Sequence, residues 1–273
     1  MVHPDTENHF EAQRIDLSQA EVSDAERLQL TDLFHEFRDR ISTGSYDLGL
    51  YEDSEIVIKT TTDTPPTRFR PPRIPVKFQK ELDDHINKLL QAGRIVKSDT
   101  PWIHTTVLVI KKDGSLRVCL DFRRLNSITI PDHYPLPRID DILTKISGHK
   151  FYTTLDLASG YMQLRLSPGI QSKYGWATHR GIYQLVYLPF GLKNAGAYYS
   201  RAMARILASL GGNCSAYLDG IVIFDKDFPG HLESLRKVFY RFRLHNIKAS
   251  GKKPTEIARS RTNFLGHVIA GNF

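Results

Sequence analysis

Apolar residues recur at helical spacing in five stretches of the chain. The first predicted helix covers 23–42: it begins at Ser23, Glu26 completes a capping box, and the apolar stripe continues to Ile41. The same periodicity predicts four further helices, which span 79–92, about 139–146, about 194–210 and 232–242.

Shorter apolar runs, rich in β-branched and aromatic residues, are mixed with these helices. The run at 214–218 is followed almost directly by another at 221–224, so a hairpin with a very short loop is expected there. Because helices and strands do not alternate strictly, the pattern favours an α+β fold over a doubly wound sheet. The other predicted strands are 105–110, 116–120, 151–156, 163–166, 183–188 and 263–269.

Two segments show no such periodicity. Residues 1–22 are polar and are predicted to form a disordered lead-in. The second predicted segment, 23–75, combines the acidic first helix with an extended connector. Five prolines between Pro65 and Pro75 exclude a helix in that part of the connector.

Charge is distributed unevenly along the chain. Residues 1–60 hold 14 acidic and 5 basic side chains, whereas the remainder holds 16 acidic and 32 basic ones. A body this basic favours a polyanionic partner, RNA or DNA first, although a merely soluble basic surface is the alternative. The acidic segment is expected to offer a separate surface for a protein partner, and its removal is expected to strengthen nucleic-acid binding.

Composition excludes several classes of protein. Cys119 and Cys214 are the two cysteines of the sequence and belong to no Cys/His cluster, which argues against a disulfide framework and a zinc finger. Their scarcity suits the cytoplasm or the nucleus. No apolar run approaches the ~20 residues of a membrane span, so no membrane partner is expected.

Two aspartates occupy places that suit a divalent metal. Asp156 ends an apolar strand, and Asp219 lies at the tip of the 214–224 hairpin. Carboxylates held by a rigid β scaffold are suitable ligands for Mg²⁺. Taken alone, Asp219 is better explained as a turn residue, because Asp-Gly is a common hairpin dipeptide.

Several ordered motifs resemble the reverse transcriptase of gypsy-type LTR retrotransposons, over about residues 26–273. The resemblance identifies the chain as a degenerate or domesticated relative of that RNA-directed DNA polymerase. The matching segments, in chain order, are Trp102, 107–117, 121–126, 134–141, 155–161, 188–192, 217–219 and 264–269.

The resemblance implies a fold as well as a family. It predicts fingers at 76–150 and a palm at 151–273, with helices backing an antiparallel palm sheet. The palm would end at a hairpin similar to the primer grip, and the thumb and RNase H domains would be absent.

The resemblance also assigns roles to individual positions. Asp156 and Asp219 would be catalytic residues that bind Mg²⁺. Cationic side chains over the incoming triphosphate would neutralise the charge that develops in phosphoryl transfer. The positions that match nucleotide-binding residues are Lys111, Lys112, Arg117, Tyr161 and Phe190. The positions that match the primer-grip hairpin are Phe264, Leu265, Gly266 and His267.

The sequence departs from the family where metal chemistry requires a third aspartate. The family motif is Tyr-x-Asp-Asp, and here Gly220 takes the place of the last aspartate. His104-Thr105 also replaces the usual Ser-Pro, and Gly196 replaces a proline. Two metal ions need enough ligand charge to offset their mutual repulsion, so polymerisation is expected to be lost or severely weakened.

Three functions are therefore open from the sequence. The chain is a catalytically inactive pseudoenzyme retained to bind nucleic acid or protein, an active polymerase that uses Asp156 and Asp219, or a remnant without a role. Mg²⁺ is the expected cofactor if the site still binds metal, and otherwise there is none. The first of these functions is the preferred hypothesis.

Overall fold

In the computed structural model, the described residues are 15–65, 74–110, 116–208, 210–217, 220–251 and 256–270. Their contacts divide the chain into two units. Unit 1 is drawn from Met1–Tyr51, Tyr134–Gly160 and Tyr199–Phe273, and unit 2 from Glu52–His133 and Tyr161–Tyr198. The predicted boundary between 76–150 and 151–273 differs from this division, because the chain passes between the two units several times.

A three-stranded antiparallel sheet forms the centre of unit 1. Its order is β11 (Cys214–Tyr217), β12 (Gly220–Asp225) and β7 (Phe151–Asp156), so β12 lies in the middle. These strands confirm the hairpin predicted at 214–224 and the strand predicted at 151–156. Side chains alternate between the two faces of the sheet, and both faces are covered.

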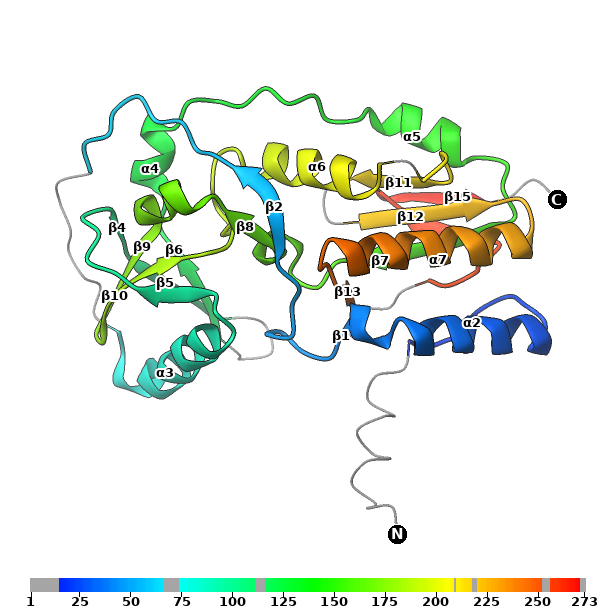
Figure 1. The fold of residues 1–273 in the computed structure, drawn as a ribbon, viewed down its shortest axis with the longest axis horizontal. Coiled ribbons are helices and arrows are strands. Elements are labelled where there is room, and N and C mark those ends of the chain that lie inside the picture. Colours follow the sequence, from blue (N-terminus) through cyan, green and yellow to red (C-terminus); the bar gives the residue numbers. More distant parts are fainter. Residues whose placement is uncertain are drawn as a thin grey trace, which may run out of the picture. The chain divides into compact units, whose positions relative to one another are not determined.

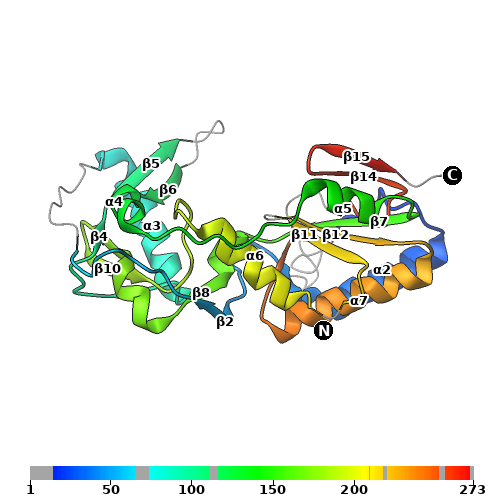
Figure 2. The ribbon, with the colours of Figure 1, turned by 90° about the horizontal axis from the view of Figure 1, so that it is seen from above.

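Helices cover one face of this sheet, and a helix and a hairpin cover the other (Figure 1, Figure 2). On one face lies α7 (Phe228–Leu244), and α2 (Asp24–Glu36) packs against it. On the other face, α5 (Ile139–Ile146) and the hairpin of β14 (Arg261–Phe264) and β15 (His267–Ala270) enclose an apolar cluster. The buried members of this cluster are Ile142, Ile146, Tyr152, Val222, Phe224, Phe264 and Ile269.

The N-terminal helix is an integral part of unit 1. Both hydrogen bonds of the predicted capping box between Ser23 and Glu26 are present. Leu30, Leu33 and Phe34 are buried, and the Phe34 ring meets the Phe239 ring of α7 edge-on at 5.6 Å between centroids. The helix is shorter than predicted: it ends at Glu36 and is followed by a 3₁₀ turn (Arg38–Arg40) and by β1 (Ile41–Ser42), which pairs with β13 (Ala249–Ser250).

Part of the predicted lead-in is packed rather than disordered. Ile15 and Ala20 are buried, and the Glu21 backbone N–H donates to the Ala258 carbonyl at 3.1 Å. Glu21 also forms an ion pair with Arg259 at 3.0 Å. The expectation of disorder therefore fails for residues 15–22, because sparse apolar residues suffice to bury a segment that gains backbone and ionic partners.

Many carboxylates of the acidic segment are engaged within unit 1. Asp39 pairs with Arg243 at 2.6 Å, and Glu36 pairs with Arg236, so two acidic groups offset the basic side of α7. Asp47 likewise pairs with Lys248. Removing residues 1–60 would therefore expose the core of unit 1, and it is unsuitable as a test of nucleic-acid binding.

Unit 2 combines a small mixed sheet with two ribbons and short helices. Its four-stranded sheet has the order β3 (Ile95–Lys97), β10 (Gly181–Leu185), β9 (Gly175–Thr178) and β4 (Ile103–His104). The predicted hairpin at 105–120 is present as β5 (Thr106–Ile110) and β6 (Leu116–Leu120), and β2 (Tyr51–Ile56) pairs with β8 (Leu164–Leu166). The helices are α3 (Val76–Gln91) and α4 (Arg123–Ile128), and α6 (Ala195–Ile206) begins at the end of the segment.

Replacing Gly175 with alanine is expected to destabilise the protein by about 1–3 kcal/mol, the usual cost of forcing an atom into a packed site. A Cβ at this position would lie 2.3 Å from the Trp102 carbonyl oxygen and 2.5 Å from the Thr100 Cγ2. The Gly175 N–H also donates to that same carbonyl at 3.0 Å, which holds β9 against β4. The free energy of unfolding in urea measures the effect.

Gly196→Ala is the matched control for this substitution. Gly196 lies in α6, and a Cβ there would meet nothing within 4 Å. Because alanine favours helix over glycine, this variant is expected to be as stable as the wild type or slightly more stable. Equal stability of the two alanine variants would show that β9 can move away from Trp102 at no cost.

Candidate functional site

The strand ends that carry the predicted metal site lie side by side in unit 1. In the antiparallel pair of β7 and β12, Asp156 is directly opposite Gly220, and Leu155 is opposite Ile221. Side chains at directly opposite positions project from the same face of a sheet. A carboxylate at position 220 would therefore lie beside the half-buried Asp156, and glycine leaves that place without a side chain.

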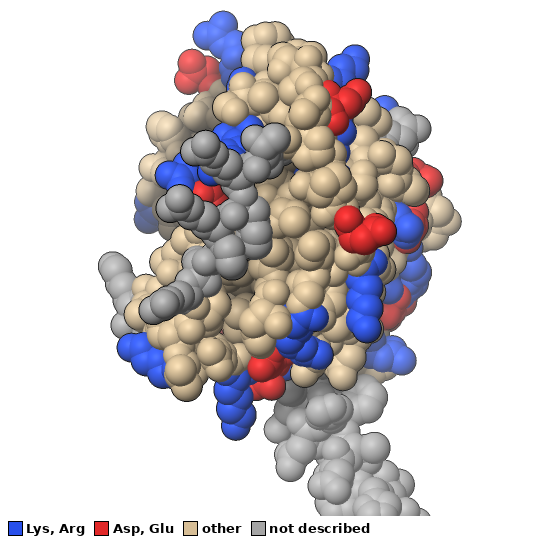
Figure 3. Space-filling model, turned by 90° about the vertical axis from the view of Figure 1, so that its left-hand side faces the viewer, with Lys and Arg blue, Asp and Glu red and all other residues tan. Residues whose placement is uncertain are grey.

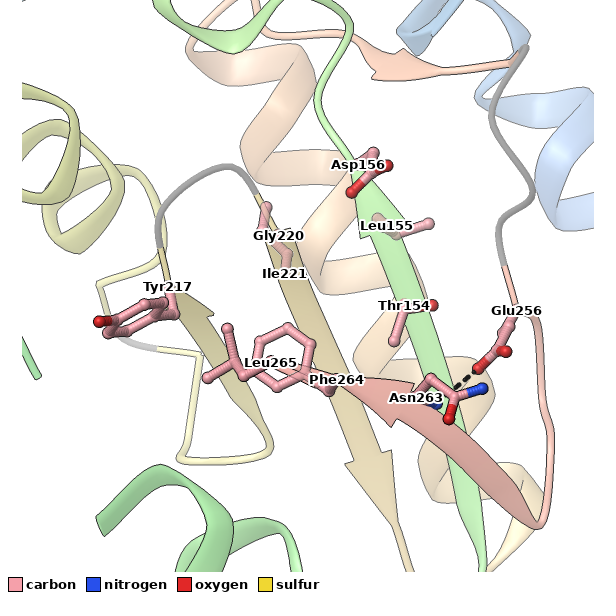
Figure 4. A pocket seen from close by; sticks show the side chains of 10 residues that line it. All are labelled: Thr154, Leu155, Asp156, Tyr217, Gly220, Ile221, Glu256, Asn263, Phe264 and Leu265. Atoms are coloured by element: carbon pink, nitrogen blue, oxygen red, sulfur yellow. Dashed lines mark hydrogen bonds between the residues drawn. The ribbon is translucent and has the colours of Figure 1, made fainter. Parts of the chain in front are cut away.

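A pocket of about 320 Å³ opens beside this pair of residues. Figure 4 shows Asp156 and Gly220 on adjacent strands, with the side chains of Phe264 and Leu265 reaching toward β12 from the β14–β15 hairpin. Polar groups lie at one side of the pocket and apolar ones at the other. The lining residues are Thr154, Leu155, Asp156, Tyr217, Gly220, Ile221, Glu256, Asn263, Phe264 and Leu265.

Space for a side chain exists at Gly220, but it is tight. A Cβ built there would lie 3.2 Å from Cε2 of Phe264 and 3.7 Å from the Tyr217 carbonyl oxygen. The backbone of Gly220 does not lie in the left-handed region, so an L-residue brings no backbone strain. A side chain at this position therefore requires the Phe264 ring to move by a few tenths of an ångström.

The primer-grip positions form the turn of the β14–β15 hairpin. Phe264 is buried in the apolar cluster under the sheet, and Leu265 is half-buried with a φ of 54°. Gly266 and His267 are exposed. Two of the four predicted residues, Phe264 and Leu265, are thus brought to the pocket that contains Asp156.

The nucleotide-binding positions belong to unit 2. Tyr161 and Phe190 lie together, with ring centroids 5.1 Å apart, and Phe190 is 55% exposed. Arg117 is exposed on β6, opposite Val109. Lys111, Lys112 and Asp219 lie outside the described residues.

The described residues do not by themselves supply the donor set of a two-metal site. Asp156 is the one predicted metal ligand among them, and they contain no group of three or more His, Cys, Asp or Glu side chains that could hold a metal ion. Asp225, a conceivable substitute, is opposite Phe151 at the far end of β12 from Gly220. It therefore cannot replace the missing carboxylate.

Several residues of this region were not foreseen from the sequence. Glu256 lines the pocket, and its Oε2 accepts hydrogen bonds from the Asn263 N–H at 3.1 Å and from the Thr262 hydroxyl. No periodicity marks Glu256, because it lies in an irregular segment. His231 did carry a signal, since it is a polar residue within the apolar stripe of α7.

No helix of the described ranges is both long and apolar enough to cross a membrane.

The sequence of the chain is similar to those of known proteins. The sequence matches the family "Reverse transcriptase (RNA-dependent DNA polymerase)" over residues 109–269. It is 34% identical over 265 residues to the retrovirus-related Pol polyprotein from transposon 297 of Drosophila melanogaster, which covers 94% of this chain and 25% of the relative. The Pol polyprotein from transposon gypsy of the same fly is 33% identical over 196 residues, covering 69% of this chain and 19% of the relative.

Solved structures show the same fold. The native protease-reverse transcriptase of prototype foamy virus matches all of this chain and 36% of its own, with a TM-score of 0.83 and 25% identity. A foamy viral protease-reverse transcriptase in complex with dsDNA matches 99% of this chain and 55% of its own, with a TM-score of 0.83 and 23% identity.

The chain thus spans about a quarter or less of the length of the polyproteins it matches. The fold is the predicted α+β arrangement of a reverse transcriptase. The aspartate strand, the hairpin with Gly220 and the β14–β15 hairpin all fall within the matched range or at its end. This chain belongs to the reverse transcriptase (RNA-dependent DNA polymerase) family, and its relatives are retrotransposon Pol polyproteins.

Proposed function

We propose that this retrotransposon-derived domain is catalytically inactive and is retained as a module that binds RNA or DNA. The observation that carries the proposal is the pairing of Asp156 with Gly220, which leaves the sheet without a carboxylate where the family has one. Two metal ions held ~3.5–4 Å apart need ligand charge between them, and this site has lost a full negative charge.

The charge of the chain supports binding to a polyanion. The sequence has a net charge of +7, although its first 60 residues are acidic. Figure 3 shows one face of the molecule on which basic side chains lie chiefly around the edge, interspersed with acidic ones, and an uncharged area lies between them. Acidic groups such as Asp39 and Glu36 are already paired with arginines of α7. They are therefore less able to repel the phosphates of a nucleic acid or to occupy other basic side chains.

The fold supports the same choice of partner. Similar foamy viral reverse transcriptases are known in complex with dsDNA and with an RNA/DNA hybrid. In unit 2, the exposed Phe190 ring on Tyr161 offers an aromatic surface, and aromatic surfaces of this kind stack on bases with little sequence preference. A nucleic acid is therefore favoured over a protein as the partner.

Binding to an RNA/DNA hybrid is expected to weaken steeply with salt. Phosphate contacts release counterions, so the Kd should rise by about tenfold or more between 50 and 200 mM salt. Fluorescence anisotropy with a labelled hybrid measures this, beside a protein of matched charge as a reference. Binding that is absent at low salt, or that does not respond to salt, would contradict the proposal and favour a protein partner.

Arg117→Ala is expected to weaken binding and to reduce the slope of log Kd against log salt by about one, as the loss of one phosphate contact does. Arg117 is exposed on the two-stranded ribbon of β5 and β6. The matched control is Lys237→Ala, which removes the same charge from the exposed side of α7, where Lys237 pairs with Glu233 at 3.6 Å. Equal effects of the two substitutions would show that only net charge matters.

A further inference from the structure

A chain of buried polar groups runs through unit 1 behind the aspartate strand. On β7, the Thr153 hydroxyl lies 2.7 Å from Nε2 of His231, and Nδ1 of that ring lies 2.9 Å from a carboxylate oxygen of Asp225. All three side chains are within 3% of complete burial. They join a strand, a helix and the end of β12, and no substrate can reach them.

The partners of Asp225 fix the direction of this chain. Its other carboxylate oxygen accepts hydrogen bonds from the Asn213 amide at 2.5 Å and the Ser234 hydroxyl at 2.9 Å. An ionised carboxylate only accepts, so His231 must carry a proton on Nδ1. Where the ring carries only that proton, Nε2 accepts and the Thr153 hydroxyl donates to it.

The Thr153 oxygen makes one further contact, with a residue in a turn whose backbone is strained. It accepts a hydrogen bond at 3.0 Å from the backbone N–H of Ala258. Ala258 is fully buried and has a φ of 47°, in the left-handed region that side chains other than glycine disfavour. Its carbonyl accepts from the Glu21 N–H at 3.1 Å, so both polar groups of the residue are held.

This turn leads directly into the β14–β15 hairpin. Arg259, the next residue, exchanges backbone hydrogen bonds of 2.8 and 2.9 Å with Tyr152. The hairpin begins two residues later, and its Asn263, Phe264 and Leu265 line the pocket beside Asp156. The position of the turn therefore determines where these three side chains stand against β7 and β12.

We propose that Thr153, oriented through His231 and Asp225, is a positioning residue that holds the Ala258 turn in its left-handed conformation and thereby fixes the β14–β15 hairpin beside Asp156. The turn is held from inside by Thr153 and from outside by the segment that contains Glu21. The inference concerns the hairpin itself and does not depend on whether the chain binds nucleic acid.

A double-mutant cycle between Thr153→Val and Ala258→Gly tests the inference. Valine removes the hydroxyl, so amides of 261–270 are expected to exchange with deuterium about tenfold faster, the effect of losing one buried hydrogen bond. Glycine adopts the left-handed conformation without strain, so in the Ala258→Gly background the same substitution is expected to change exchange by about twofold or less. Amides of β9 and β10 in unit 2 serve as the reference for global opening.

Two outcomes would overturn the inference. One is an equal effect of Thr153→Val in both backgrounds, because Thr153 would then not act through the turn. The other is a His231 ring protonated on Nε2 alone, as read from its ¹⁵N chemical shifts in the wild-type protein, because that ring cannot donate to Asp225. The second measurement needs no variant, so it stands even if Thr153→Val fails to fold. Thr153→Ser keeps the hydroxyl and is expected to retain wild-type exchange in the hairpin.

Discussion

A primer-extension assay with Mg²⁺ or Mn²⁺ is expected to show no template-directed DNA synthesis by the wild-type chain above background. Phosphoryl transfer of this kind depends on two metal ions, one at the attacking hydroxyl and one at the triphosphate. Gly220 leaves the place opposite Asp156 without a carboxylate. The loss of one charged ligand in such a site is expected to slow the reaction by about 10²–10⁴-fold or more.

Gly220→Asp separates metal binding from catalysis. The new carboxylate would stand opposite Asp156, with the Phe264 ring yielding slightly to its Cβ, so Mn²⁺ is expected to bind about tenfold more tightly or better, a change of ~1.4 kcal/mol. Gly220→Asn is the matched control, because it adds nearly the same volume without the charge. Electron paramagnetic resonance of free Mn²⁺ measures both variants against the wild type.

Synthesis is expected to recover much less than metal binding does. Metal binding depends on the charge close to the site. Synthesis is expected to depend also on the segments that depart from the family. One of these is at His104, which is buried, packs against Phe122 with the two rings tilted and their centroids 4.6 Å apart, and contacts the Lys173 carbonyl at 2.9 Å. Robust extension by the wild type would refute the inactive reading and favour a polymerase that works with Asp156 and Asp219. Full rescue by Gly220→Asp would show that catalysis was lost through this one position.

The pattern of the sequence predicted local structure well. The capping box of Ser23, the apolar stripe of α7 and the hairpin of β11 and β12 all depend on neighbouring residues, and all are present. Strands β3, β4 and β9 were not predicted, because they are only two to four residues long and show no clear alternation.

The arrangement of these elements could not be read from periodicity. Residues 134–160 belong to unit 1 and 161–198 to unit 2, yet both are ordinary mixtures of strand and helix in the sequence. Periodicity shows which face of an element is apolar, but it does not show which core that face joins. The linear division into 76–150 and 151–273 therefore differs from the contacts.

The candidate site, too, could be predicted from the sequence only in part. The motifs identified Asp156 and Gly220, whereas the register that sets them directly opposite each other is known only from the structure. The Ala258 turn had no signal, since alanine is an unexpected residue at a φ of 47°. The contact of Asp225 with His231 was also hidden, because no pattern in the sequence links the end of a strand to one side chain of the following helix.

Asp225→Ala is expected to destabilise the protein by about 3–5 kcal/mol, because several hydrogen-bond donors lose an acceptor that no water replaces, at about 1–3 kcal/mol each. The carboxylate accepts from His231, Asn213 and Ser234, and Asp225 is 2% exposed. Its loss leaves the buried His231 ring and two half-buried donors, Asn213 and Ser234, without this acceptor. Because domains of this kind are stable by only about 5–15 kcal/mol, a large part of the folding free energy is at stake.

Asp227→Ala is the matched control for this prediction, because it removes a carboxylate two residues away on the exposed side of the same turn. Asp227 caps α7 by accepting from the Gly230 N–H at 2.8 Å, so its loss is expected to cost only about 1 kcal/mol.

Asp225→Asn should fall between the two variants: its amide oxygen still accepts from Ser234 or Asn213, but its NH₂ group faces the Nδ1 proton of His231. Urea denaturation of the three variants gives the order directly. An Asp225→Ala protein within about 1 kcal/mol of the wild type would show that water replaces the lost acceptor, and that the buried polar chain contributes little to the stability of unit 1.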